Sequence, residues 1–129
     1  MAITFDEVVK ARYVSLTTFT KDGRPKPAPV WVAPAGDRVL VISEDKAWKV
    51  KRIRNTPRVT VAVCDVRGNV KSEAVEATAR LLDKSENGLV YDAIGKKYGI
   101  VGRVFNLFSK HVRGGMKTNV GIELTPAAD

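Results

Sequence analysis

The feature that most constrains the fold is a succession of short runs rich in β-branched and aromatic residues. Consecutive strands joined by hairpin turns favour an antiparallel sheet or barrel with helices at its ends, and they exclude a nucleotide-binding fold of alternating strands and helices. Asp22-Gly23 is a strong hairpin signal between the first two runs. The runs predict six strands, at residues 13–19, 26–32, 38–43, 59–66, 75–82 and 118–124.

Helix signals separate some of these strands. Thr4 and Glu7 have the spacing of a capping box, in which each residue satisfies a backbone N–H of the other, and Asp83 and Glu86 repeat that spacing. A short basic helix follows the third strand. The remaining helices are predicted over residues 4–10, from 83 to about 97, and over 100–112, before a last strand and a tail at 125–129.

The second strand is unusual because it contains three prolines. Pro25, Pro27 and Pro29 have no N–H to donate to a neighbouring strand, so the first half of 26–32 is predicted to be an edge or a bulge. Such an edge leaves backbone against which a ligand can lie, and the alternative is a protected edge strand without a ligand. A turn is predicted at 34–37.

The basic helix lies within residues 46–63, KAWKVKRIRNTPRVTVAV, with Asp45 as its predicted N-cap and Pro57 just beyond its end. Ala47, Val50 and Ile53 form its inward face. Five lysines and arginines within nine residues repel one another unless an anion lies among them. Lys49 falls in the first turn, where free N–H groups and the helix dipole favour a phosphate or carboxylate. The alternative is a solvated basic face.

The net charge of +8 favours an anionic partner, whether nucleic acid, membrane surface or a phosphorylated or polycarboxylate ligand. No basic strand interleaved with aromatic residues is visible, so nucleic acid is the less favoured partner. No apolar run approaches the roughly 20 residues of a membrane span. The first residues lack the apolar core of a signal peptide, and Cys64 is the only cysteine. We therefore expect a cytoplasmic protein with a single domain over residues 1–129.

Residues suited to catalysis are scarce. His111 and Cys64 are the only histidine and the only cysteine, so they cannot build an ordinary zinc site. A nucleophile–histidine set would depend on His111, which lies in a basic segment, and no paired carboxylates are evident. If the chain is an enzyme, a bound cofactor must supply the difficult chemistry while the protein supplies position and electrostatics.

Four stretches in order carry a resemblance to a known family: SLTTFTKDGRPKPAPVWV, RVLVIS, KVKRIRNTPRVTVAVCDVRG and VEATARLLD. Together they resemble the pyridoxamine 5′-phosphate oxidase-like split β-barrel family, and within it the small actinobacterial subgroup that uses the deazaflavin coenzyme F420. The resemblance spans residues 13–124 and is looser over 91–117. It implies a mainly β fold, an antiparallel split barrel of six to seven strands with short helices at its ends.

The resemblance also implies a cofactor site. The lysine at the start of the basic helix, here Lys49, binds the cofactor phosphate in the family. The strand after the hairpin turn lies along the ring, which points to Pro29, Val30 and Trp31. The end of the next strand contributes a hydroxyl, here Ser43.

Other positions follow from the same comparison. Trp48 stands where phosphate-oxidase members often carry arginine, a difference that counts against a flavin mononucleotide (FMN) version of the site. Lys51 and Arg52 are expected to meet the oligoglutamate tail of F420, and Lys26 is a further candidate.

The implied protein is a homodimer with its cofactor sites at the subunit interface. Its expected activity is an F420-dependent hydride transfer to or from a small unsaturated or quinone-like substrate. The alternatives are an FMN-dependent oxidase or reductase of the same fold and a non-catalytic cofactor-binding module.

Overall fold

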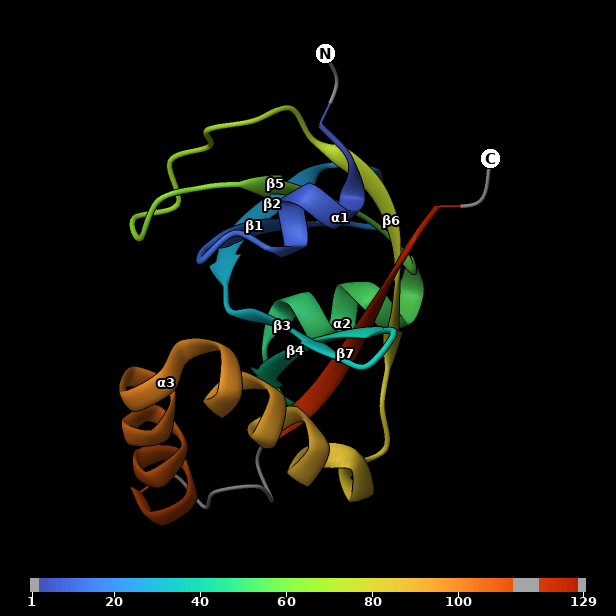
Figure 1. The fold of residues 1–129 in the computed structure, drawn as a ribbon. Coiled ribbons are helices and arrows are strands. Elements are labelled where there is room, and N and C mark those ends of the chain that lie inside the picture. The colour runs from blue at the N-terminus through green and yellow to red at the C-terminus, as the bar shows by residue number, and fades with distance from the viewer. Residues whose placement is uncertain (1–2, 113–118, 128–129) are drawn as a thin grey trace.

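The computed structural model describes residues 3–112 and 119–127, with the backbone alone over 100–112. Its strands form one antiparallel sheet in the order β2-β1-β5-β6-β7-β4-β3, which curls into a half-barrel (Figure 1). The strands are β1 Val14–Phe19, β2 Pro25–Val30, β3 Val32–Ala35, β4 Arg38–Glu44, β5 Arg58–Val63, β6 Val75–Leu81 and β7 Asn119–Pro126. This architecture confirms the predicted split β-barrel.

The split lies between β2 and β3, which are the two edges of the sheet although only Trp31 separates them in the chain. The prediction of one strand over 26–32 was therefore wrong, because the chain leaves one edge at Val30 and begins the other at Val32. The described strands number seven rather than six. The predicted turn at 34–37 is shorter than expected, because Pro34 and Ala35 pair with β4 and only Gly36 and Asp37 turn. The expected proline-rich edge is confirmed.

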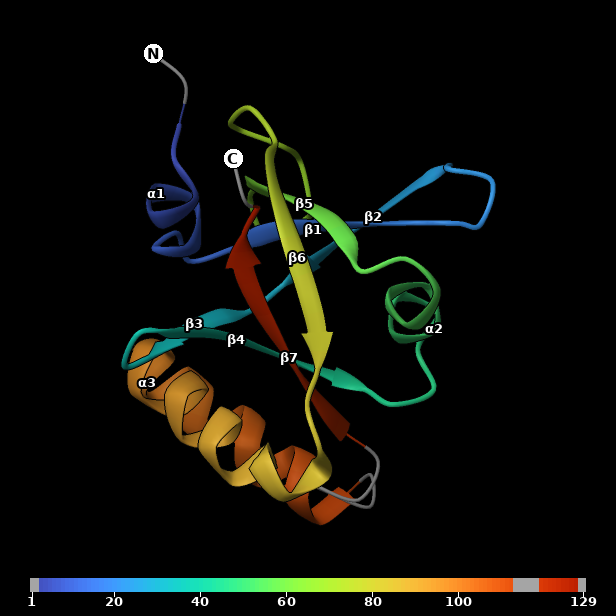
Figure 2. The ribbon, with the colours of Figure 1, turned by 90° about the vertical axis from the view of Figure 1, so that its right-hand side faces the viewer.

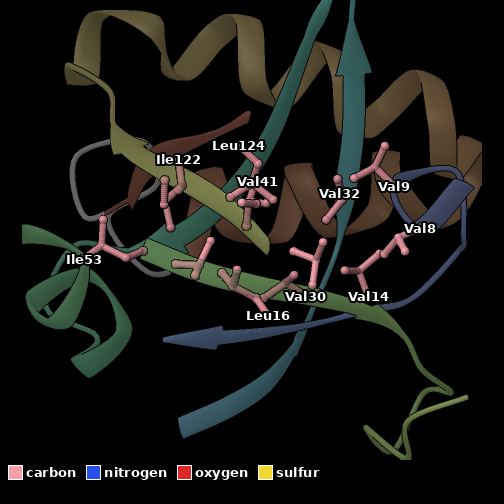
Figure 3. Packing of buried hydrophobic residues seen from close by; sticks show 14 of the residues in the cluster. Val8, Val9, Val14, Leu16, Val30, Val32, Val41, Ile53, Ile122 and Leu124 are labelled. Carbon is pink, nitrogen blue, oxygen red and sulfur yellow. The ribbon is translucent and has the colours of Figure 1, made fainter. Parts of the chain in front are cut away.

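The main core fills the inside of the curl. Side chains from alternate positions of neighbouring strands meet there, including Leu16, Val30, Val41 and Ile122 (Figure 3). A second, smaller cluster lies on the other face of β3 and β4, where Leu40 packs against Ile94 of α3. Strand β4 therefore serves both clusters, which explains its nearly continuous apolar sequence.

Two short helices flank the barrel. Helix α1, Phe5–Val9, begins at the predicted capping box of Thr4 and Glu7. Helix α2, Trp48–Asn55, buries Val50 and Ile53 as predicted. The prediction of Asp45 as its N-cap was wrong. The helix begins at Trp48 with Ala47 as N-cap, so Asp45 lies too far from the first-turn amides and pairs with Lys84 instead.

The segment after β6 forms the 3-10 turn η1, Lys84–Glu86, followed by α3, Asn87–Val112. The helix breaks at Gly99 (φ 60°, ψ −130°), which confirms a boundary between the two predicted helices. Asp83 is an N-cap as predicted, but its carboxylate accepts from the Ser85 amide at the start of η1. Glu86 does not close a capping box, because its carboxylate pairs with Arg38.

The last described strand, β7, continues through Pro126. The predicted tail at 125–129 was therefore placed too early, since Thr125 pairs with Thr78 and Pro126 with Ala77. The adjacent glycines Gly114 and Gly115 predict a helix break before the last strand, and this position lies outside the described residues. Among the described helices, none combines the length and apolar character needed to cross a membrane.

Candidate functional site at the start of helix α2

The first turn of α2 is unusual because nothing in it neutralises the helix N-terminus. Its N-cap, Ala47, has no side-chain hydrogen bond to the turn, and none of the first-turn residues is acidic. The first N–H groups of a helix have no partner within the helix, and the helix dipole places positive potential there. Lys49, the second residue of α2, adds a full positive charge. The turn therefore combines the features that bind a phosphate or a carboxylate.

Lys49 is half-buried rather than solvated. Burial lowers the pKa of its ammonium, the nearby Glu44 opposes this change, and Arg52 lowers the pKa further. The effect of Arg52 places two cations of α2 in one electrostatic neighbourhood. Their mutual repulsion disfavours the protein without a ligand, and a bound anion would relieve it.

Arg52 is held against the barrel by a strand residue. Its Nη1 donates to Thr18 Oγ1 at 3.2 Å, and the Thr18 hydroxyl donates to the Lys26 carbonyl at 3.5 Å. Thr18 is fully buried. Thr18 and Lys26 are direct partners in the β1–β2 ladder, and residues directly opposite in a sheet share a face. The structure thus brings Arg52 and the exposed Lys26 to the same end of the β1–β2 hairpin.

Thr18 was not among the residues singled out from the sequence. Its signal lies in the alternation of its strand, where Val14 and Leu16 face the core and Thr18 follows on the same face. A threonine at an inward position needs a polar partner. That requirement indicates an interaction without identifying Arg52.

Ser43 lies near the end of β4, a short turn before α2. It is largely buried, and its Oγ donates to the Glu44 carbonyl at 3.2 Å. The hydroxyl can still accept hydrogen bonds through its oxygen. Its placement shows only that the strand end and the start of the helix are neighbours in the chain and the fold.

Three residues were predicted to contact the cofactor ring. The structure places them in different surroundings. Pro29 is exposed and lies beside Gly68, where an added Cβ would be 3.5 Å from the Pro29 ring. Val30 points into the main core (Figure 3). Trp31 stacks on Tyr98 of α3, with ring centroids 4.5 Å apart and planes inclined by 14°. Tyr98 was also missed from the sequence.

Trp48 and Lys51 form an exposed pair on α2. The Lys51 ammonium lies 4.5 Å from the centroid of the Trp48 ring, and the tryptophan is 69% exposed. Trp48 cannot supply the charged donor that an arginine would at this position. The pair therefore presents a flat aromatic surface and a cation close to Lys49 in the sequence.

Other kinds of site are missing from the described residues. Within 3–99 and 119–127, where side chains are described, no group of three or more metal-binding side chains comes together. Cys64 is buried, and burial raises the pKa of its thiol, as for a small core residue rather than a nucleophile. The His111 side chain lies outside the described residues.

The sheet topology and the cationic start of α2 together define a split-barrel protein with a basic helix N-terminus. The sequence profile described as Pyridoxamine 5′-phosphate oxidase matches residues 4–127, so the chain belongs to that family. This match confirms the family predicted from the sequence. A comparison with curated protein sequences gave no match.

Solved structures share the fold at low sequence identity. The conserved hypothetical protein Rv2991 from Mycobacterium tuberculosis superposes with a TM-score of 0.68 at 19% identity, covering 99% of this chain and 83% of that one. The heme storage protein HutZ from Vibrio cholerae gives 0.66 at 14%, covering 100% and 93%. A protein named F420 reductase gives 0.61 at 18%, covering 99% and 97%. At these identities the likeness extends to the fold alone.

Proposed function

We propose that the chain is an F420-dependent oxidoreductase that transfers a hydride between the deazaflavin and a small unsaturated or quinone-like substrate. The observation that carries this proposal is the first turn of α2, where uncapped amides meet the half-buried cation Lys49. The donor set suits an anionic cofactor, because an amine, a guanidinium and backbone N–H groups all favour phosphate or carboxylate oxygens. The likeness to an F420 reductase is consistent with it.

Each candidate residue has a role in the proposal. Lys49 would hold the cofactor phosphate, with Ser43 as a further hydrogen-bonding partner. Arg52, fixed by Thr18, would bind the carboxylates of the oligoglutamate tail together with Lys51 and Lys26. When bound, the deazaflavin supplies a hydride donor or acceptor, so the protein needs little acid–base machinery of its own.

The chain segment Pro29–Trp31 would lie along the ring. The Val30 side chain is committed to the core, so its contribution would come through the backbone, whereas Trp31 and the exposed Trp48 would border the ring with aromatic surface. These residues would orient the ring and exclude water from the acceptor, which favours hydride transfer over side reactions.

The proposed partner of the barrel is a second copy of the chain. A half-barrel would leave the ring of a flavin-sized cofactor partly uncovered, and a second subunit would close the site. Large apolar residues that are exposed in the single chain support an interface with this second copy. They are Trp48 beside the candidate site and Val66 and Val70 on the loop after β5.

The nearest rival is an FMN-dependent oxidase or reductase of the same family. FMN also carries a phosphate, so Lys49 alone does not separate the two cofactors. The exposed Trp48 in place of a charged donor favours F420. A cofactor carrier without catalysis is the rival from another class, and the heme storage protein of the same fold makes it worth testing.

The test is a titration of the purified protein with F420 and, separately, with FMN. The quenching of tryptophan fluorescence measures binding in both titrations. Tight F420 binding with weak FMN binding would support the proposal, and the reverse order would establish the flavin rival. Tight binding of F420 without hydride transfer to any of a panel of quinones and unsaturated carbonyl compounds would favour a carrier.

The Lys49→Ala variant tests the site itself. It should weaken F420 binding by about 1.5–3 kcal/mol, the range for a hydrogen bond to a charged group. Because it also removes a repulsive charge, the fold should stay intact or gain slightly in stability. Lys46→Ala is the matched control, since Lys46 is exposed and lies before the helix. An F420 affinity that is equal in the two variants would remove Lys49 from the site.

A further inference from the structure

A cleft lies on the side of the barrel away from helix α2. The cleft, of about 650 Å³, opens between α1, the turn from β3 to β4, and the first half of α3. In Figure 2 these three elements lie on the left of the molecule, whereas α2 lies on the right, so the cleft is separate from the candidate cofactor site. Its volume falls within the roughly 300–1,000 Å³ of small-molecule sites.

The floor of the cleft is apolar, with Val9, Val39 and Ala93 from three different elements. Lysines from two helices reach its rim. Lys10 at the end of α1 and Lys96 of α3 are exposed, and neither forms an ion pair with any described residue. These two ammonium groups are available to a ligand.

The other cations of the cleft are already committed. The Arg38 guanidinium pairs with Glu86 at 3.1 Å and with Glu123 at 3.0 Å. The Lys97 ammonium donates to the carbonyl oxygens of Val9, Ala11 and Val32. These bonds make the two residues part of the wall rather than ligand-binding groups.

Two carboxylates limit how much negative charge the cleft can take. Asp6 of α1 and Asp37 of the β3–β4 turn also line it, and neither pairs with a described cation. With two free ammonium groups and two free carboxylates, a polyanion would meet repulsion, whereas a single negative charge can lie near the lysines. The net positive charge of the whole chain favours an anion over a cation.

A peptide strand is a poor fit, although β3 is an edge of the sheet. The outward backbone of Val32 is already bound to α3, its N–H to the Tyr98 hydroxyl at 3.2 Å and its carbonyl to Lys97. Two residues further along, the same edge position is Pro34, which has no N–H. An added strand would therefore find few partners, and the cleft suits a compact molecule.

We infer that this cleft binds an amphipathic monoanion, a carboxylate or sulfonate on an apolar body, with the charge at Lys10 and Lys96 and the apolar part on the floor between α1 and α3. This inference is independent of the cofactor proposed for α2. It gives the protein a second ligand site on the side of the barrel away from α2.

The test uses 8-anilino-1-naphthalenesulfonate, an apolar ring system with one sulfonate. The probe is titrated into the full chain, and its fluorescence measures binding. We expect saturable binding that the Lys10→Glu/Lys96→Glu double variant weakens by about tenfold. The Asp6→Asn/Asp37→Asn double variant should tighten binding by about twofold to threefold, since it removes repulsion. Thermal unfolding followed by circular dichroism verifies that each variant is folded.

Lys21→Glu/Arg67→Glu is the matched control, because it changes the net charge equally at exposed positions outside the cleft. Equal affinities in the wild type, this control and the lysine double variant would overturn the inference. Loss of binding in Lys49→Ala alone would also overturn it, by placing the probe at α2. Failure of the F420 titration together with lysine-dependent probe binding would instead overturn the proposed function and support the cleft.

Discussion

Thr18 is a single buried hydroxyl that connects a helix cation to a strand backbone. Thr18→Val keeps the shape of the side chain but removes both its hydrogen bonds, to Arg52 and to the Lys26 carbonyl. We expect a loss of about 1–3 kcal/mol in the free energy of unfolding, because the arginine loses a partner in a partly buried setting. Urea unfolding measures this loss.

The neighbouring Thr17→Val is the control, since Thr17 lies on the opposite face of β1. If Arg52 binds the cofactor as proposed, Thr18→Val should also weaken F420 binding, whereas Thr17→Val should not. A Thr18→Val protein as stable as Thr17→Val would contradict the structural role of the hydroxyl.

At the scale of single residues, the sequence predicted where charged side chains lie better than it predicted which groups they bind. The position of Lys49 in the first turn of α2 was predictable, because helix position and charge are both local properties. Thr18, Tyr98 and Lys97 were missed, because their partners lie between 8 and 88 residues away along the chain. No local pattern encodes which distant group will satisfy a buried hydroxyl or amine. Asp45 was misassigned because the helix begins two residues later than predicted, and its carboxylate pairs with the distant Lys84.

Helix α3 packs on the sheet through a glycine of β7. A Cβ at Gly121 would lie 2.8 Å from Val90 Cγ2 and 3.2 Å from Leu82 Cδ1, and the β-branched valine has little freedom to move. Gly121→Ala should therefore lower the free energy of unfolding by about 1–3 kcal/mol. Gly88→Ala, in the first turn of α3 with open space around it, should leave stability unchanged or raise it by up to about 1 kcal/mol. Thermal unfolding of the two variants would reveal the difference, and equal melting temperatures would contradict the close contact.

Lys97 fastens α3 to α1 and β3 by donating to three backbone carbonyls, at 3.0 Å (Val9), 2.7 Å (Ala11) and 2.5 Å (Val32). Burial lowers the pKa of this ammonium to about 8, below the ordinary value of 10.5. Between these two pH values the unfolded chain binds more protons at this site than the folded one, so the contribution of Lys97 to stability should rise with pH and level off above 10.5.

A pair of variants isolates this effect from other titrations. Lys96→Met keeps Lys97 and should show the rise between pH 8 and 10.5, whereas Lys97→Met should lack it. The difference in their free energies of unfolding, measured by urea at several pH values, reports the contribution of Lys97 alone. A difference that stays constant over this range would show that the Lys97 pKa is the same in both states.

At the scale of the whole molecule, the proposed homodimer can be tested by measuring the mass of the protein in solution. Sedimentation equilibrium should give twice the chain mass of 14.1 kDa at micromolar concentration. Trp48→Glu, which places a charge on exposed apolar surface, should shift the equilibrium toward the monomer if this residue lies in the interface. Leu89→Glu is the control, because Leu89 is exposed on α3. A monomeric wild type would exclude the two-subunit cofactor site.

The overall architecture was predictable because its determinants are local. Alternation, turn residues and proline positions identified most strands, and their antiparallel order followed from short connections. The position of the split at Trp31 was not predicted, since residues 26–32 form an unbroken extended stretch in the sequence. Only the three-dimensional closure of the sheet shows that this stretch serves two edges.

The link through Trp31 also limits how the chain can change in length. Side chains alternate between the two faces of a strand, so one inserted residue would turn every following side chain of β3 to the wrong face. Val30 and Val32 face the same core from opposite edges (Figure 3), and an insertion between them would expel one of the two. Relatives that differ in length should therefore gain or lose residues in the turns at 20–24 and 65–70, and keep one residue at this crossing.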